Sequence, residues 1–252
     1  KAECPSNVDV AKLKMEFLYQ YQKEKGLPLR SWLVGNFAKL SNIASYVPFL
    51  YNVVMGTPAI RRISNALVGF HPDRTMPLMA KQTLWSWLKG RTSPVQSKSV
   101  YLFVDEFTNF NDAEIGRTAV LLLERLGYEV KTISHPISGR AYLSKGMLDE
   151  ARVLAMQNVR LWSSLISENT PLVGIEPSAI LTFRDEYPDL VSEEWVEKAQ
   201  ELAKNTFLLE EFIAREADAK RIASSAFSTE KKLLKLHGHC QQKALSGVAH
   251  SV

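Results

Sequence analysis

The spacing of hydrophobic residues changes near residue 95 of the chain. Before that point, apolar residues recur every three or four positions in segments separated by glycine and proline, as in amphipathic helices. The first helix is expected to begin near Asp9, an N-cap residue type, and to end at Gly26. Further apolar segments at 31–40 and 46–54 suit short helices packed on a partner surface. The pattern predicts a helical region over residues 1–95.

A different pattern follows a linker. The segment from Lys89 to Ser99 is polar and rich in turn residues, which is typical of a domain boundary. Beyond it, short continuous apolar runs, expected of strands covered on both faces, alternate with helical patterns. The expected strands are residues 100–104, 128–133, 171–175 and 233–236, and the expected helices are residues 115–126, 144–166, 179–184 and 194–217. This alternation predicts a mostly parallel, doubly wound α/β domain over residues 99–252.

Composition excludes several classes of protein. The 252 residues are 46% hydrophobic, enough for the core of one large domain or two ordinary ones. The net charge of +4 comes from scattered residues of both signs, so no nucleic-acid partner is expected. Two distant cysteines, Cys4 and Cys240, exclude a disulfide framework and indicate a reducing compartment. No apolar run approaches the roughly 20 residues of a membrane helix, and we expect a cytoplasmic protein.

Polar side chains follow every expected strand. In parallel α/β sheets, ligands bind beyond the carboxyl ends of the strands, where loops and helix N-termini converge. The side chains at these ends are Asp105, Glu106 and Asn109 after the first strand, His135, Ser138, Gly139 and Arg140 after the second, Glu176 and Ser178 after the third, and His237, His239 and Cys240 after the fourth. If the sheet is parallel, all four sets lie along one edge and form a single crevice. The nucleophile-elbow, dinucleotide-binding and Walker motifs are absent from the sequence.

Residues 237–240 form the densest group of potential ligands. The imidazoles of His237 and His239 and the thiolate of Cys240 suit zinc, iron or an iron-sulfur centre. Gly238 allows the loop to turn tightly. The alternative is that one or both histidines hydrogen-bond the backbone at a turn.

The other candidates also have two interpretations. Asp105 and Glu106 precede a helix, so they either cap it or contact a metal or substrate. Glu176 follows a strand directly, and Pro177 is expected to limit capping of the next helix by the Glu176 side chain, so a role at a site and a structural role are both open. The loop Ser138-Gly139-Arg140 either holds an anion or leaves Arg140 paired with a neighbouring acid.

Several stretches of the sequence resemble a known family. They are residues 3–9 with 14–18, residues 138–140, 143–152, 174–178 and 183–190, and residues 236–245. Together they resemble the iron-sulfur, cysteine-rich (CCG-type) C-terminal portion of FAD-linked oxidases and D-2-hydroxy acid dehydrogenases. This portion is related to the iron-sulfur polypeptide of glycolate oxidase and to the cysteine-rich polypeptide of heterodisulfide reductase.

The resemblance implies a ligand set that this sequence retains only in part. Cys4 followed by Pro5 looks like the last cysteine of a ferredoxin motif that binds a 4Fe-4S cluster, with the other three cysteines expected before Lys1. The family's Cys-Cys-Gly motif is matched here by residues 137–139, Ile-Ser-Gly, and both thiols are absent. Asp105-Glu106 stands where relatives often carry a cysteine. A second Cys-Cys-Gly segment is expected beyond Val252, so the domain is expected to be incomplete.

The resemblance implies a role in electron transfer. Our leading hypothesis is the iron-sulfur portion of a flavin-dependent 2-hydroxy acid oxidoreductase, which passes electrons from FAD on a flavin-binding domain or subunit to an acceptor. The first alternative is a docking module of the same oxidoreductase without a cluster. The second is a single zinc or iron site, with Glu106 or Glu176 as acid or base. The expected cofactor-binding residues are Cys4, Ser138, Gly139, Arg140 and Glu176, and the expected metal ligands are Cys4, Glu106, His237, His239 and Cys240.

Overall fold

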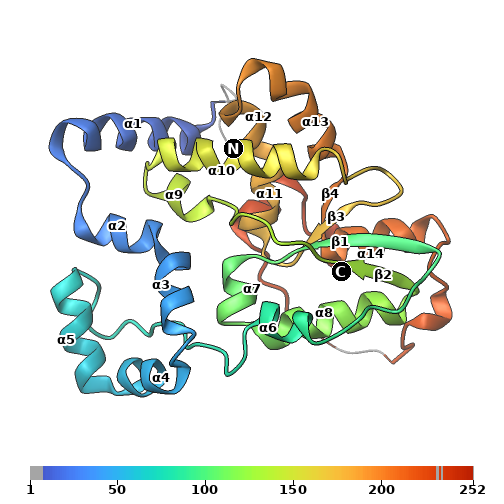
Figure 1. Ribbon diagram of the computed structural model, residues 1–252, viewed down its shortest axis with the longest axis horizontal. Coiled ribbons are helices and arrows are strands. Elements are labelled where there is room, and N and C mark those ends of the chain that lie inside the picture. Colours follow the sequence, from blue (N-terminus) through green and yellow to red (C-terminus); the bar gives the residue numbers. More distant parts are fainter. Residues whose placement is uncertain (1–7, 231–232, 234, 252) are drawn as a thin grey trace.

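A computed structural model describes residues 8–230, 233 and 235–251 of the chain. Its sheet has four parallel strands in the order β2-β1-β3-β4. The strands are β1 (Lys98–Phe103), β2 (Tyr128–Lys131), β3 (Leu172–Gly174) and β4 (Thr206–Leu208). This arrangement confirms the α/β fold class, with strands and helices alternating after the helical N-terminal region (Figure 1).

The helices fall into an N-terminal group and a group that follows the strands. In the N-terminal part they are α1 (Val10–Lys25), α2 (Leu29–Gly35), α3 (Phe37–Ala44), α4 (Pro48–Gly56), α5 (Pro58–Val68) and α6 (Leu84–Lys89). In the α/β part they are α7 (Glu106–Phe110), α8 (Ala113–Arg125), α9 (Arg140–Ser144), α10 (Leu148–Trp162), α11 (Pro177–Asp185), α12 (Tyr187–Leu190), α13 (Val196–Lys204), α14 (Leu209–Asp218) and α15 (Cys240–Leu245).

The fourth strand lies elsewhere than the sequence pattern predicted. The helix expected at residues 194–217 is divided into α13 and α14 by β4, whose three residues are all buried. The strand expected at 233–236 is wrong for the residues described there: Leu233, Lys235 and Leu236 have no strand structure, and Leu233 is 94% exposed. Thr206, Phe207 and Leu208 extend the buried apolar layer of the sheet, and this burial outweighs their helical spacing.

Two apolar cores cover the two faces of the sheet. Leu102 and Val173 face one core, which α6, α8 and α14 complete, and Phe103 and Leu172 face the other, against α10, α11 and α13. Figure 1 shows α10 and α13 on the opposite side of the strands from α8. Alternate residues of each strand therefore point to opposite cores, which explains the continuous apolar runs in the sequence.

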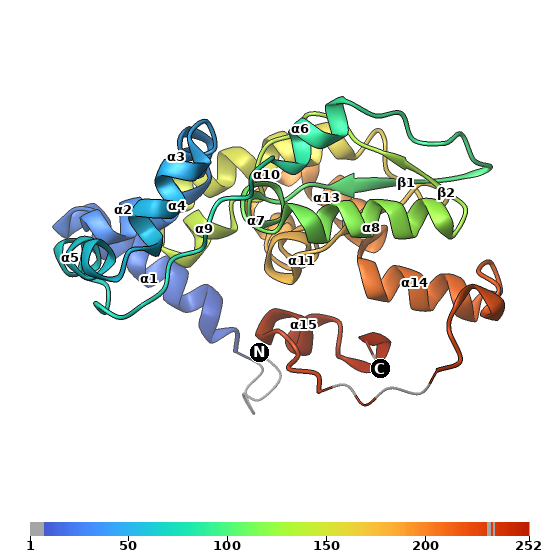
Figure 2. The same cartoon turned by 90° about the horizontal axis from the view of Figure 1, so that it is seen from below.

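Helices α1–α5 form a helical arm beside the α/β domain (Figure 2). Apolar side chains join the arm to α9 and α10, with Met15 of α1 buried in a cluster that includes Tyr142 and Met147. The hydroxyl of Tyr19 also donates a 2.7 Å hydrogen bond to Oδ1 of Asp149. The arm is thus held against the carboxyl-end edge of the sheet. The domain boundary between residues 89 and 99 stays a prediction.

Candidate ligand pocket at the carboxyl ends of the strands

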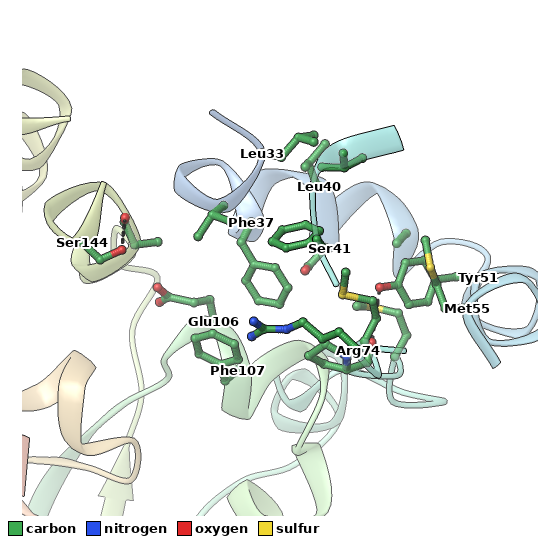
Figure 3. Close-up of a pocket in the computed structure, with 18 of the residues that line it drawn as sticks. Leu33, Phe37, Leu40, Ser41, Tyr51, Met55, Arg74, Glu106, Phe107 and Ser144 are labelled. Atoms are coloured by element: carbon green, nitrogen blue, oxygen red, sulfur yellow. Dashed lines mark hydrogen bonds between the residues drawn. The ribbon is translucent and has the colours of Figure 1, made fainter. Parts of the chain in front are cut away.

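A cavity of about 650 Å³ lies between the helical arm and the carboxyl ends of the strands. Most of its lining is apolar and comes from the arm, as with Phe37, Leu40 and Phe70. The α/β domain contributes polar side chains from three of the strand ends and from the loop before α15. They are Glu106, Arg140, Glu176, Ser178 and His239. Figure 3 shows Glu106 at one end of this pocket and the aromatic ring of Phe37 near its middle.

Asp105 caps the helix that follows β1. Its Oδ1 accepts hydrogen bonds from the backbone amides of Phe107 (2.9 Å) and Thr108 (2.8 Å), and its Oδ2 accepts one from the Thr108 hydroxyl. The capping interpretation therefore describes Asp105. Its side chain is buried, and this burial raises the pKa of Asp105 to about 6 against the opposing effect of the Thr108 hydrogen bonds.

Glu106 has a different environment from its neighbour. The residue is only 3% exposed, and its Oε1 accepts one long hydrogen bond, 3.4 Å, from the Ser138 hydroxyl. Its Oε2 has no hydrogen-bond partner within the described part of the chain. Burial, followed by the negative charges of Asp105 and Glu176, raises the pKa of Glu106 to about 7. A buried carboxyl oxygen without a partner, at the wall of a cavity, is the most unusual polar group of the pocket.

The Ser138-Gly139-Arg140 loop is folded around buried hydrogen bonds. The Ser138 hydroxyl accepts from the amide of Arg140 (3.2 Å), and the Ser138 carbonyl accepts from the hydroxyl of Tyr187 (2.9 Å). Gly139 has a φ of 75°, a left-handed conformation that suits glycine, and is the N-cap of α9. Arg140 forms an ion pair of 2.5 Å with Oε1 of Glu186, so its charge is matched by a neighbouring acid as the second interpretation expected.

Glu176 is the N-cap of α11, which corrects our expectation that Pro177 limits such capping. Its Oε2 accepts a hydrogen bond of 2.6 Å from the amide of Ala179, and both carboxylate oxygens accept from the Ser178 hydroxyl. Proline at the first helical position has no amide that needs a partner, and its fixed φ suits a helix start. Pro177 therefore leaves the Glu176 side chain free to reach the amide of Ala179.

Residues 237–240 reach the pocket edge through one side chain. His239 lines the pocket and is the N-cap of α15, where its Nδ1 accepts a 3.2 Å hydrogen bond from the amide of Gln241. Helix α15 packs against α11 (Figure 2), which brings His239 to the pocket that Glu176 also lines. His237 and Cys240 are exposed and do not line the pocket. His239 therefore matches the alternative in which a histidine of this segment hydrogen-bonds the backbone at a turn.

His135, another strand-end residue, belongs to the core. Its ring stacks on Phe103 with centroids 4.4 Å apart, and its Nε2 accepts from the amide of Val104 at 3.1 Å. Burial lowers the pKa of His135 to about 4, so the imidazole is neutral at physiological pH. This histidine supports the end of β1 and does not reach the pocket lining.

The gathered side chains do not fit an iron-sulfur cluster. Such clusters need thiolates, whereas the polar end of the pocket offers carboxylates and one imidazole whose capping bonds are already made. Among residues 8–230, 233 and 235–251, no group of three or more His, Cys, Asp or Glu side chains could hold a metal ion. The metal-ligand roles of Glu106, His237, His239 and Cys240 stay predictions without support from this geometry. Cys4 lies outside the described residues.

The apolar half of the pocket could not be foreseen from the sequence. Phe37 stacks on Phe107 with ring centroids 4.8 Å apart, joining the arm to α7. Leu40 and Phe70 complete the same wall. The sequence signal was only the apolar segment at 31–40, which suits the inner face of a packed helix equally well.

No helix within the described residues is long and apolar enough to cross a membrane.

Comparisons with known proteins give distant relatives. The chain is 24% identical to D-2-hydroxyglutarate dehydrogenase of Escherichia coli strain K12 over 235 residues, which cover 88% of this chain and 22% of the relative. It is 21% identical to one of the subunits of the anaerobic glycerol-3-phosphate dehydrogenase of the same strain, covering 75% of this chain and 48% of the relative. It is 30% identical to lactate utilization protein A of Bacillus licheniformis over 59% of this chain and 60% of the relative.

The chain therefore spans about a fifth of the length of the D-2-hydroxyglutarate dehydrogenases that it matches. No family model matches the chain, and no solved structure matches it. The relatives include dehydrogenases and one component of a multi-subunit dehydrogenase, so the similarity is to oxidoreductases.

Proposed function

We propose that this chain is a portion of an FAD-linked 2-hydroxy acid oxidoreductase and that it serves there as a docking module whose α/β domain holds no cluster. The similarity to D-2-hydroxyglutarate dehydrogenases over most of the chain supports the enzyme class. Another relative is named as one of several subunits of a dehydrogenase, which supports a multi-part oxidoreductase. FAD would lie on a flavin-binding domain or subunit outside this chain. The cytoplasmic location stays a prediction.

One observation carries the cluster-free assignment. Where the family resemblance implies thiolates at the strand ends, Ser138 and Glu106 are buried and hydrogen-bonded to each other. Oε2 of Glu176 and Nδ1 of His239 accept hydrogen bonds from the amides of the helices that they cap. These local hydrogen bonds support the proposal that the α/β domain holds no cluster.

The helical arm provides a surface for docking. Tyr46, Phe49 and Leu67 are 80%, 82% and 80% exposed, although apolar side chains of this size are ordinarily buried. Monomeric proteins rarely leave large apolar patches in contact with water. A flavin-binding domain or subunit that covered these side chains would remove their apolar area from water.

Docking can be measured between this chain and the flavin-binding part of the same oxidoreductase. We expect Phe49→Asp combined with Leu67→Asp to weaken association at least tenfold, because both charges would be buried against the partner. Val153→Asp is the matched control, since Val153 is 57% exposed on α10 and lies outside the arm. Equal affinities of the double variant, the control and the unsubstituted chain would exclude the arm as the docking surface.

A second candidate is electron transfer through a 4Fe-4S cluster that uses Cys4. It is favoured by Cys4-Pro5, followed by a helix whose start is capped by Asp9. In this role the portion would pass electrons from FAD to an acceptor. In this candidate, the other three cysteine ligands would come from residues that precede Lys1.

Iron and sulfide analysis of the anaerobically purified oxidoreductase tests the Cys4 cluster and the cluster-free α/β domain separately. Loss of iron and sulfide in Cys4→Ser would support electron transfer through this cysteine. The double variant His239→Ala, Cys240→Ala should retain the iron and sulfide of the unsubstituted protein, because these residues form no ligand group. Loss of metal in the double variant would refute the cluster-free assignment of the α/β domain.

A further inference from the structure

The pocket between the helical arm and the sheet has two chemically distinct ends. Its arm side is formed by apolar and aromatic side chains such as Phe37, Leu40 and Phe70. Its sheet side presents Glu106, whose Oε2 is buried and has no partner among the described residues. A cavity of about 650 Å³ falls within the range that small-molecule sites occupy.

The unpartnered oxygen indicates a hydrogen-bond donor that the described residues do not supply. A buried polar atom without a hydrogen bond costs about 1–3 kcal/mol, so a ligand that donates to it gains affinity by removing this cost. Ser138 reaches only the other oxygen, Oε1, and at a long distance. In Figure 3 the Glu106 carboxylate lies at the end of the pocket nearest Ser144, beyond the aromatic rings.

The charges at this end favour a cation. The negative charges of Asp105 and Glu176 act on Glu106, and of the two arginines that line the pocket Arg140 is already paired with Glu186. The lining holds two carboxyl groups, Glu106 and Glu176, and Arg74 is its one arginine that is not paired with Glu186. A cationic head group would balance part of this negative charge and form a charge-assisted hydrogen bond with Glu106.

The second arginine, Arg74, shows that the lining accommodates a cation. Arg74 is an exposed residue, and its guanidinium lies 5.8 Å from the centroid of the Phe70 ring, which also lines the pocket. Aromatic faces attract ammonium groups as well as guanidinium groups. A long exposed side chain such as Arg74 can move aside when a ligand enters.

From this geometry we propose that the pocket binds an amphipathic primary amine, with its ammonium group on Oε2 of Glu106 and its aromatic or aliphatic body against Phe37, Leu40 and Phe70. The binding site does not depend on the flavin-binding partner or on any cluster. A carboxylic acid of the same shape would place a negative charge beside Glu106 and be rejected. An alcohol of the same shape would bind with intermediate affinity.

Calorimetric titration with three matched probes at pH 8 tests the proposal. We expect 4-phenylbutylamine to bind the full chain at least tenfold more tightly than 4-phenylbutanoate, with 4-phenylbutanol between them. The substitution Glu106→Gln keeps the shape and removes the charge, so it should weaken amine binding at least tenfold. Glu114→Gln is the control, because the side chain of Glu114 is 83% exposed on α8 and does not line the pocket.

A second variant keeps the test independent of Glu106. Ala44 lines the arm side of the pocket, and Ala44→Trp would fill the space of the ligand body and abolish amine binding. Circular dichroism would verify that each variant is folded. The proposal is overturned if the carboxylate binds as tightly as the amine, if the amine shows no saturable binding, or if folded Glu106→Gln and Ala44→Trp both bind it unchanged.

Discussion

Burial of Glu106 makes the stability of this protein depend on pH. The pKa of this carboxyl rises from 4.5 to about 7 in the folded chain, chiefly because burial disfavours its ionised form. At about 1.4 kcal/mol for each tenfold change in proton affinity, the difference corresponds to about 3 kcal/mol of folding free energy. A group with a raised folded pKa stabilises the fold below its unfolded pKa, and this contribution is lost as pH rises through the folded value. Stability should therefore fall between about pH 4.5 and about pH 7.

Glu106→Gln isolates this contribution. Glutamine cannot ionise, so the fall in unfolding free energy between pH 4.5 and pH 8 should shrink by about 3 kcal/mol relative to the unsubstituted chain. Asp105 remains in the variant and retains a smaller fall of its own, because its pKa is raised to about 6. The comparison uses the change with pH, since the new amide also alters the hydrogen bonding at every pH.

Urea unfolding at several values between pH 4.5 and pH 8, followed by circular dichroism, gives the required free energies. Glu114→Gln is the control, because that acid is exposed and its removal should leave the pH dependence unchanged. If Glu106→Gln and the unsubstituted chain lose the same free energy over this range, Glu106 is already ionised at low pH and the reasoning from burial is refuted.

Three further substitutions test the packing around the pocket. Tyr187→Phe should lower the unfolding free energy by about 1–3 kcal/mol, because the buried Ser138 carbonyl loses the hydroxyl that donates to it; an unchanged urea midpoint would contradict this. Gly146→Ala should speed hydrogen exchange of α1 amides with little effect on the sheet, because a Cβ there would lie 2.9 Å from the backbone nitrogen of Tyr19 in a left-handed conformation. Equal exchange rates in α1 would be evidence against that docking. Gly174→Ala should lower the unfolding free energy measured in urea by about 1–3 kcal/mol, because the new methyl would lie 2.5 Å from the Ile180 side chain. An unfolding free energy equal to that of the unsubstituted chain would mean that α11 moves away easily.

Local interactions explain which strand-end features the sequence could predict. Asp105 caps a helix because its side chain reaches amides two and three residues along, a contact that needs no distant partner. The first three strands were recognisable because strands buried on both faces require continuous apolar runs. The error at Glu176 was also local: the helix-start preference of Pro177 was interpreted as an obstacle to capping when it is compatible with it.

Tertiary contacts decided the remaining features. The sequence at 206–208 has the spacing of a helix, but pairing with β3 and burial on both faces make it a strand, whereas Leu233 finds no apolar cover. The sequence by itself determined the first three strands, the helices that follow them and the convergence of Glu106, Arg140 and Glu176 at one sheet edge, because these follow from periodicity and chirality. The apolar half of the pocket and the unpartnered oxygen of Glu106 depend on how the arm closes over that edge, through contacts between residues far apart in the chain such as Phe37 and Phe107.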